Sequence, residues 1–314
     1  MSDQDSRRIT PPTGRREAKG QQAGKAVWKS VRVGDLRPVE YIAERAEGAV
    51  FRGYWAPSKE ERDRREAPDV AQALMTGLER VCLRAYNSLT QAPRYEARIL
   101  RRFRRRIHHY LPGVSLPENS LELIALMQHH GAPTRLLDWT YSPYVAAHFA
   151  LIHASRRPAG ADLAIWTIRP NWCRDASKAA CKGMKPPPVA LWKQIDNPGD
   201  DQRAGSSLLS GKLPPSVWPV NPFRLNERLT IQQGLFLAPG DVRESFIRNI
   251  AKLPSFGESN LTRYVIPHSR SHAVAQSLYR MNVTETTLFP GLDGFARSLG
   301  FLHEGPERDG DATR

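Results

Sequence analysis

The feature that most constrains the fold is a segment rich in polar, aromatic and turn-forming residues, at positions 128–143 (QHHGAPTRLLDWTYSP), with helical patterns on both sides. Asn119 has the position of an N-cap for the first helix, and Gly131 has the position of the residue that ends it. Ser142 and Pro143 have the pattern of an N-cap and first residue for the second helix. We therefore expect two helices that hold a short polar connection in a defined shape, a setting in which binding and catalytic residues concentrate.

Length and composition exclude several classes of protein. The chain has 314 residues, which is enough to bury a core without disulfides or a structural metal. Its three cysteines fit a reducing compartment, and no group of Cys and His residues has the spacing of a metal site. No run approaches the roughly 20 apolar residues of a membrane span, and the polar N-terminus has no signal-peptide core. We expect a cytoplasmic protein with no metal and no membrane association.

The net charge of +14 fits two different situations. One is a polyanionic partner such as a nucleic acid, and the other is a solvated basic surface with no specific partner. Residues 94–110 are the strongest nucleic-acid candidate, because their helical pattern places seven arginines opposite an apolar face. These arginines do not alternate with aromatic residues that could stack on bases. Both interpretations therefore stay open.

The domain organisation follows from shifts in composition. Residues 1–26 are polar and basic and are predicted to be a disordered tail, because they contain too few apolar residues to offset the entropy of ordering. Residues 27–300 are predicted to form one domain, followed by a flexible tail at residues 301–314. Within the domain, residues 170–223 are rich in proline, lysine and polar residues. We expect this stretch to be a long loop insertion with little regular structure.

The apolar patterns predict an α+β fold with small antiparallel or mixed sheets and flanking helices. Strands are expected at residues 49–55, 162–168 and 264–266. Residues 227–237 are expected to form a strand interrupted by a bulge at Gly234. The chain has no GxGxxG, P-loop, GxSxG or HExxH motif, which removes several classes of enzyme.

Arg52 is predicted to lie at the end of the strand at residues 49–55. A guanidinium in that position is costly unless it is paired or faces a cleft. One interpretation is a structural bridge to a core carboxylate such as Asp138. The other is a clamp for a phosphate or carboxylate of a ligand, for which the planar guanidinium is suited. The residues alone favour neither interpretation.

Four motifs, taken in order, resemble the FRG domain family. They are FRG at 51–53, QHHG at 128–131 continued by PTRLLDWT at 133–140, QGLF at 233–236, and LFPGLDG at 288–294. The resemblance extends from about residue 33 to residue 296. It implies a protein of bacterial or phage type, and it identifies a fold family more firmly than an activity. A role in a defence or toxin system is the setting that we expect from it.

A second resemblance concerns residues 140–150, whose pattern TxSPxVAxxFA is similar to the Ser-Thr-Ser segment and following helix of arginine-specific ADP-ribosyltransferases. In those enzymes an early-strand arginine contacts NAD, the hydroxyl segment supports the nicotinamide ribose, and a late-strand glutamate is catalytic. The resemblance therefore implies an ADP-ribosyltransferase-like fold and catalytic roles for Arg52, Thr140, Ser142 and Gln233. Gln233 departs from the pattern, because an amide cannot supply the charge of a glutamate. The residues expected to contribute to binding are Gly53, Tyr54, His129, His130, Arg135, Asp138 and Gln232.

Three hypotheses of function follow. The first is an NAD-dependent ADP-ribosyltransferase-like enzyme or NAD hydrolase, with NAD as substrate, no metal, and a protein or nucleic-acid acceptor. The alternative is a non-catalytic module that binds a nucleotide-like small molecule or a nucleic acid. The third is a hydrolase in which His129, His130 and Asp138 act as general acid and base. One of these histidines could instead cap the preceding helix, where a cation is favourable.

Overall fold

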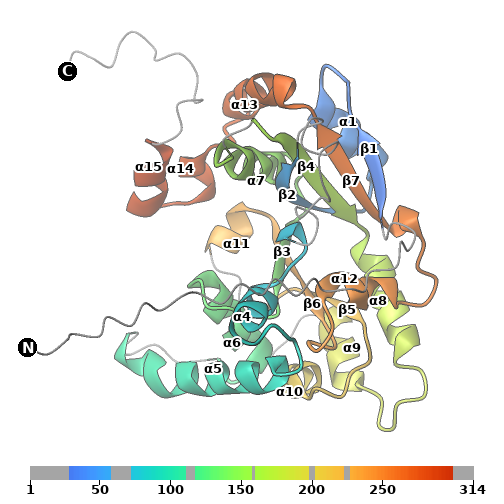
Figure 1. The fold of residues 1–314 in the computed structure, drawn as a ribbon. Helices are drawn as coiled ribbons and strands as arrows, with labels where there is room; N and C mark the ends of the chain where they lie inside the picture. Colours follow the sequence, from blue (N-terminus) through green and yellow to red (C-terminus); the bar gives the residue numbers. More distant parts are fainter. Residues whose placement is uncertain are drawn as a thin grey trace, which may run out of the picture.

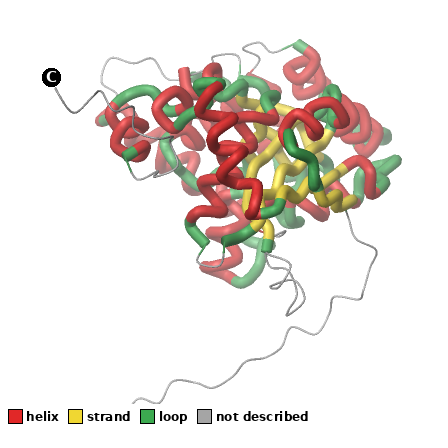
Figure 2. The backbone as a smooth tube through the Cα atoms, turned by 90° about the horizontal axis from the view of Figure 1, so that it is seen from above, coloured by secondary structure: helices red, strands yellow, loops and turns green. Residues whose placement is uncertain are grey.

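The computed structural model describes residues 28–57, 72–110, 117–157, 160–197, 202–222 and 227–299. The predicted tails at residues 1–26 and 301–314 lie outside these ranges. In the described part, strands run through the centre and helices surround them (Figures 1 and 2).

The strands form one seven-stranded sheet with the order β1-β7-β4-β2-β3-β6-β5. β1 is parallel to β7, and every other neighbouring pair is antiparallel. The predicted α+β class is confirmed, but the short strands join into one mixed sheet instead of several small ones. The strands are β1 (Lys29–Arg32), β2 (Val50–Ala56), β3 (Leu137–Thr140), β4 (Asp162–Ile168), β5 (Val217–Val220), β6 (Gly234–Pro239) and β7 (Leu261–Ile266).

The helices lie on both faces of this sheet (Figure 2). Among those described, none is both long and apolar enough to cross a membrane. They are α1 (Pro38–Arg45), α4 (Gly77–Tyr86), α5 (Ala92–Arg106), α6 (Ser120–His129), α7 (Pro143–Ser155), α8 (Pro170–Ala180), α9 (Val189–Asp196), α10 (Gln202–Leu209), α11 (Glu227–Ile231), α12 (Phe246–Ala251), α13 (Ser271–Arg280), α14 (Glu285–Leu288) and α15 (Leu292–Ser298), with short 3-10 turns η1 (Ile107–His109), η2 (Glu258–Asn260) and η3 (His268–Arg270).

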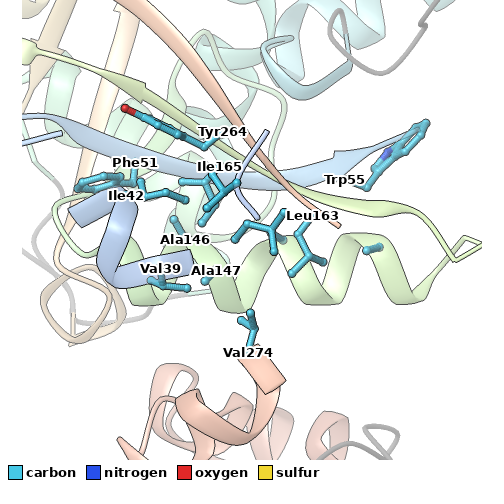
Figure 3. Close-up of a cluster of buried hydrophobic side chains, with 14 of the residues drawn as sticks. Val39, Ile42, Phe51, Trp55, Ala146, Ala147, Leu163, Ile165, Tyr264 and Val274 are labelled. Carbon is cyan, nitrogen blue, oxygen red and sulfur yellow. The ribbon is translucent and has the colours of Figure 1, made fainter. Parts of the chain in front are cut away.

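One apolar core lies between α7 and the half of the sheet that contains β7, β4 and β2. Figure 3 shows Ala146 and Ala147 of α7 below Phe51 and Leu163 of the strands, with α1 and α13 completing the layer. The approach of α7 to β2 requires a glycine at position 53. A Cβ at Gly53 would lie 1.7 Å from the carbonyl oxygen of Ala146. The third residue of the FRG triplet therefore permits the packing of α7 on β2.

Two further apolar clusters cover the other half of the sheet, which contains β3, β6 and β5. On one face, α8 and α12 pack on Leu235 and Leu237 of β6. On the other face, α6, α9 and α10 pack on Phe236 and Ala238 of the same strand. The alternation of contacts along β6 is that of a strand buried on both sides.

The helix boundaries around residues 128–143 are confirmed. The Asn119 side chain accepts a hydrogen bond from Leu121 N at 2.9 Å, and Ser142 Oγ accepts one from Val145 N at 3.3 Å. Gly131 has a φ of 76°, which is the left-handed conformation expected after a helix end. The connection between the helices is not wholly a loop, however, because Leu137–Thr140 forms the strand β3.

Residues 170–223 are not a loop insertion, contrary to the prediction. They contain the helices α8, α9 and α10 and the strand β5. Three of their apolar residues, Leu191, Leu208 and Trp218, are fully buried in the cluster that α6 forms with β6. The prolines of this stretch suggested irregular structure, but proline is also compatible with the start of a helix. Pro170 is the first residue of α8, where a missing N–H removes no helical hydrogen bond.

The prediction of a strand with a bulge at residues 227–237 is also wrong. Glu227–Ile231 is the helix α11, and the strand β6 begins only at Gly234. The helix folds back over the start of the strand. Leu229 lies so close to Gly234 that a Cβ at this glycine would be 2.2 Å from Leu229 Cδ1. Gln233 makes the reversal in a left-handed conformation with a φ of 47°.

Candidate functional site

The candidate site lies where β2 and β3 separate. β2 pairs with β4 along its whole length, from Val50 opposite Ile168 to Ala56 opposite Asp162. With β3 it pairs at one register position, Phe51 opposite Thr140. Beyond that position the two strands diverge. Residues 72–80, which precede and begin α4, lie next to this gap through their contacts with Arg52.

Arg52 connects the two strands. It lies in the middle of β2, not at its end as predicted. Its Nε donates to the carbonyl oxygen of Ala73 at 2.7 Å, and its Nη1 donates to the carbonyl oxygen of Asp138 at 2.6 Å. Arg52 does reach Asp138, but the partner is the backbone carbonyl. Within the described part of the chain, no carboxylate forms an ion pair with Arg52.

Charges of both signs act on Arg52. Burial lowers the pKa of the Arg52 guanidinium; the Asp138 carboxylate opposes this effect and Arg80 adds to it. The ring of His153, on α7, lies 4.4 Å from the ring of Tyr54. Burial, and next the charge of Arg52, lower the pKa of His153 to about 4, so this imidazole is neutral at pH 7. The site therefore places the cationic Arg52, Arg80 and Arg228 around one exposed carboxylate, that of Asp138.

Asp138 is the exposed acidic group of the site. Its Oδ2 accepts a hydrogen bond from Gln128 Nε2 at 2.9 Å, and Gln128 Oε1 accepts one from Thr134 Oγ1 at 2.6 Å. This chain of contacts connects the end of α6 to β3. Gln128, Thr134 and Asp138 of the central motif thus fix the turn, and Gln128 orients the Asp138 carboxylate.

The two histidines of the motif stand beside Arg228. The His129 and His130 rings are 4.9 Å apart at an interplanar angle of 78°, and His130 is the C-cap residue of α6. Burial lowers the pKa of His129, and His130 and Arg228 lower it further. Burial also lowers the pKa of Arg228, which the Asp138 carboxylate opposes. Among the described residues, neither imidazole hydrogen-bonds to Asp138, so the acid–base pair of the hydrolase hypothesis is not assembled here.

Thr140, Ser142 and Gln232 come together, but their polar groups have partners within the protein. Thr140 Oγ1 donates to the Gln232 carbonyl at 2.7 Å and accepts from Ser142 N at 3.0 Å. Ser142 Oγ caps α7, and Gln232 Nε2 donates to the Leu288 carbonyl at 3.0 Å. These contacts tie β3, α7, α11 and α14 together at the rim of the site. Their direct effect is to hold the rim in place.

Gln233 lies at the start of β6 with its side chain exposed. Its carbonyl oxygen accepts a hydrogen bond from Tyr141 N at 2.9 Å, and Gly234 is the register partner of Thr140. The arginine strand β2, the hydroxyl-bearing strand β3 and the late strand β6 are therefore consecutive in the sheet. No carboxylate occupies the Gln233 position.

Arg135 is not part of the site. It is only 1% exposed and forms a two-point ion pair with Glu96 of α5, with Nε to Oε1 at 2.7 Å and a second bond from Nη2 to Oε2. Its Nη1 donates to the carbonyl oxygens of Leu208 and Pro239 at 2.9 and 3.2 Å. Arg135 thus connects α5, α10 and β6 in the interior.

Sequence reasoning missed Arg80, His153 and Arg228 as neighbours of the site. Arg80 and His153 belong to helices whose patterns gave no functional signal, and the fold alone brings them to Arg52. Arg228 could have been suspected, because it precedes the QGLF motif by a few residues. Its guanidinium carbon lies 4.5 Å from the ring centroid of Phe289, so it connects that motif to LFPGLDG.

The cysteines do not contribute a reactive group. Cys82, Cys173 and Cys181 are buried free thiols, and burial raises the pKa of Cys181 to about 11. A protonated, buried thiol is a poor nucleophile. In the ranges that the structure describes, no group of three or more Cys, His, Asp or Glu side chains could hold a metal ion.

The comparison with protein families agrees with the central motif. The family model of the FRG domain matches residues 65–158, which include α4, α5, α6, β3 and α7. The match contains the motif at residues 128–143 and leaves Arg52 and the two later motifs outside. No curated protein and no solved structure matches the chain.

Proposed function

Because the FRG-domain match contains the central motif and Arg52 contacts that motif at Asp138, we propose that the surface around Arg52 and Asp138 binds NAD. The proposed activity is ADP-ribosyl transfer or NAD hydrolysis. Arg52 contacts the pyrophosphate, and Asp138 supplies the carboxylate that is missing at Gln233. Bacterial or phage defence, or a toxin system, is the biological setting in which we place this activity.

The observation that most supports the proposal is the state of Arg52. It is a buried-strand arginine whose hydrogen bonds in the described structure go to two neutral carbonyl groups. Its charge is therefore not neutralised by an ion pair; Arg80 adds positive charge beside it, and the Asp138 carboxylate offsets part of it. A pyrophosphate would supply the compensating charge in a geometry that guanidinium groups bind well.

Asp138 is the carboxylate best placed for chemistry. The other carboxylate that acts on Arg228, that of Glu285, is buried and paired with His148 at 3.1 Å and with Arg297 at 3.5 Å. Asp138 is exposed, and its hydrogen bond to Gln128 leaves one carboxylate oxygen directed away from that amide. A negative charge held beside the ribose would stabilise the positive charge that develops there.

The reaction balances without a metal or a redox partner. In hydrolysis, water attacks C1′ of the nicotinamide ribose, the C1′–N bond breaks, and nicotinamide leaves with the bonding electrons. The proton of the attacking water passes to a carboxylate and then to solvent. In transfer, a nucleophilic group of a protein or nucleic acid replaces water and loses its proton in the same way.

The test is to measure nicotinamide release and NAD binding for the wild-type protein and for three variants. Arg52→Ala is expected to weaken NAD binding by at least roughly tenfold, which corresponds to the loss of one charge-assisted contact. Asp138→Asn is expected to lower turnover by roughly 100-fold with little change in affinity. Arg248→Ala, an exposed arginine on α12, is the matched control and should change neither quantity.

Chromatography of the reaction products would measure turnover, and calorimetry would measure affinity. Absence of both binding and turnover in the wild-type protein would overturn the proposal. Turnover that survives Asp138→Asn would remove the assigned role of Asp138, while leaving NAD as the substrate.

A second candidate function is a non-catalytic nucleotide- or nucleic-acid-binding module, which the exposed face of α5 favours. The arginines of this face, Arg94, Arg98, Arg101, Arg102, Arg104, Arg105 and Arg106, are all exposed, and none forms an ion pair with a described carboxylate. Arg98 hydrogen-bonds to the Tyr86 hydroxyl, and both Tyr86 and Tyr110 are exposed near the ends of α4 and α5. Aromatic rings are therefore available beside the arginines after all.

Fluorescence polarisation with a labelled single-stranded oligonucleotide would test this candidate. Binding through the arginine face predicts that affinity falls steeply with salt, with a logarithmic slope of about −0.7 for each phosphate contacted. Arg101→Gln combined with Arg105→Gln should reduce that slope, and Arg248→Gln should not. A slope near zero would count against a nucleic-acid partner.

A further inference from the structure

A second potential binding site is a cavity between α7 and α13. Its volume is about 500 Å³, which is within the range of sites that hold small organic molecules. Of the described residues that line the cavity, none belongs to the proposed NAD site. Val274 of α13 points toward α7 and belongs to the core contact between these two helices (Figure 3).

One part of the cavity wall is apolar. Leu151 of α7, Leu163 of β4 and Leu278 of α13 contribute to it, and Leu163 and Leu278 are otherwise almost wholly buried in the first core. An apolar body of a ligand that covers these side chains would remove hydrocarbon surface from water. This is the main source of affinity in small-molecule sites of this kind.

The wall of the cavity contains arginine and histidine side chains but, among the described residues, no acidic ones. The side chains concerned are Arg157, His148, His268 and His272. The His148 ring is paired with the buried Glu285 at 3.1 Å, so the other three are the groups open to an anion. Arg157 lies over the Trp55 ring at 3.9 Å and donates to the neutral side chain of Gln72 at 3.4 Å, so its charge is not offset by an ion pair in the described structure. The wall is therefore suited to a ligand with a negative charge.

The position of His268 is well defined. Its backbone N–H donates to Asp162 Oδ1 at 2.9 Å, which fixes the short turn η3 beside β4. Its ring lies against Gly160, where a Cβ would be only 3.0 Å from the imidazole. The absence of a side chain at Gly160 thus gives this ring its place in the cavity wall.

A buried hydroxyl in the same wall has no partner. Ser271 Oγ is inaccessible to solvent and makes no hydrogen bond within the described part of the chain. A buried polar atom without a partner is uncommon in native proteins, because it loses the hydrogen bonds that it makes with water when unfolded. Because the atom is closed to solvent in this structure, a ligand would reach it only after the Ser271 side chain changes rotamer.

We propose that this cavity binds a small organic anion with an apolar body, of the class of aliphatic or aromatic carboxylates and sulfonates. The apolar body lies against Leu151, Leu163 and Leu278. The anionic group lies at the wall formed by Arg157, His268 and His272. This site is separate from the proposed NAD site and does not depend on it.

The probe for the test is 8-anilinonaphthalene-1-sulfonate, an aromatic anion whose fluorescence rises in apolar surroundings. Its neutral analogue N-phenyl-1-naphthylamine has nearly the same ring system without the charge. We expect one bound sulfonate per chain and an affinity at least roughly tenfold higher than that of the neutral dye. Equal affinity for the two dyes would overturn the assignment of an anion.

Two alanines of α13 provide a matched pair of variants. Ala275 lines the cavity, whereas Ala273 is exposed on the same helix and does not. Ala275→Phe should fill the cavity and reduce binding of both dyes by at least roughly tenfold, while Ala273→Phe should leave binding unchanged. Equal binding by the two variants would show that the dye lies elsewhere, for example on the α5 arginine face.

A second variant addresses the case in which Ala275→Phe does not fold, which thermal unfolding would reveal. Arg157→Gln combined with His268→Gln removes the charge and keeps the apolar wall. It should weaken the sulfonate roughly tenfold and leave the neutral dye unchanged. A loss of affinity for both dyes, or for neither, would contradict the proposed position of the anionic group.

Discussion

Two arginines in buried regions of this molecule, Arg135 and Arg52, have opposite environments. Arg135 has a carboxylate, that of Glu96, and backbone carbonyls as partners, and it is 1% exposed. Arg52 has two backbone carbonyls as partners and no described carboxylate in an ion pair. The neutralised Arg135 connects elements of the interior, whereas Arg52 keeps a charge without an ion pair, which is why we propose that it contacts a ligand. The two arginines are thus distinguished by their hydrogen-bond partners, a carboxylate for Arg135 and only carbonyl groups for Arg52.

Removing Arg135 should have the largest effect on stability. Arg135→Ala would leave the Glu96 carboxylate buried without a counter-charge, which costs about 3–5 kcal/mol of the free energy of unfolding. Urea denaturation would measure the loss. Replacing both partners, as Arg135→Met with Glu96→Leu, should recover most of it, because neither charge then remains buried. A double variant as unstable as Arg135→Ala would mean that the carbonyl contacts, not the ion pair, dominate.

Substitution of Gly53 tests the packing that supports Arg52. In Gly53→Ala the new Cβ would lie 1.7 Å from the Ala146 carbonyl oxygen, so α7 or β2 must shift, at a cost of about 1–3 kcal/mol or more. Gly34→Ala is the matched control, because a Cβ at Gly34 meets nothing within 4 Å. Thermal unfolding would compare the two. If both variants unfold at the wild-type temperature, the close approach of α7 does not constrain position 53.

Arg52→Ala should destabilise the protein less than Arg135→Ala does. Two hydrogen bonds to carbonyls are lost, at about 1 kcal/mol each, and no carboxylate in the described ranges is left without its ion pair. Stability should fall by about 2 kcal/mol in urea denaturation, while ligand binding is lost. A destabilisation as large as that of Arg135→Ala would abolish the distinction between the two arginines.

The smallest effect concerns pH. The pKa of His153 in the folded protein, about 4, lies below its ordinary value of 6.5, so between these pH values the unfolded chain binds more protons. This contribution to stability is complete above pH 6.5 and is lost as pH falls toward 4. We expect a loss of about 1 kcal/mol, after allowance for the partial exposure of the ring. Urea denaturation at several pH values would show it.

The control variants for pH separate the ring from its neighbours. His153→Gln should flatten the pH dependence in this window, and Arg52→Ala should shift it to higher pH, because the charge of Arg52 contributes to lowering the pKa. The exposed His109 provides a matched substitution, His109→Gln, that should preserve the wild-type slope. An unchanged slope in His153→Gln would assign the effect to other groups.

Local signals in the sequence were sufficient for many of the elements. Asn119, Gly131 and Ser142 marked the helix boundaries around the central motif, because capping depends on residues close in sequence. The continuous apolar run of β4 likewise identified a strand buried on both faces. Where the local pattern determined the structure, the prediction was confirmed.

The incorrect predictions concern elements that tertiary contacts determine. Residues 227–231 form a helix because Leu229 can pack over Gly234, a contact that no residue pattern reveals. The helices of residues 170–223 depend on a cluster shared with α6 and β6. Arg52 and Arg135 could not be distinguished from the sequence, because Glu96, the partner that neutralises Arg135, lies far along the chain.

The single register position between β2 and β3 also has a consequence for how the molecule opens. β2 pairs with β4 along its whole length, but the backbone ladder between β2 and β3 has one register position, Phe51 opposite Thr140. The contacts of Arg52 and one shared apolar cluster also connect the two halves of the sheet. Segments joined by few hydrogen bonds open as separate cooperative units in native-state hydrogen exchange. The amides of β7, β4 and β2 should therefore exchange as one group and those of β6 and β5 as another. A ligand held by Arg52 and Asp138 would slow both groups together.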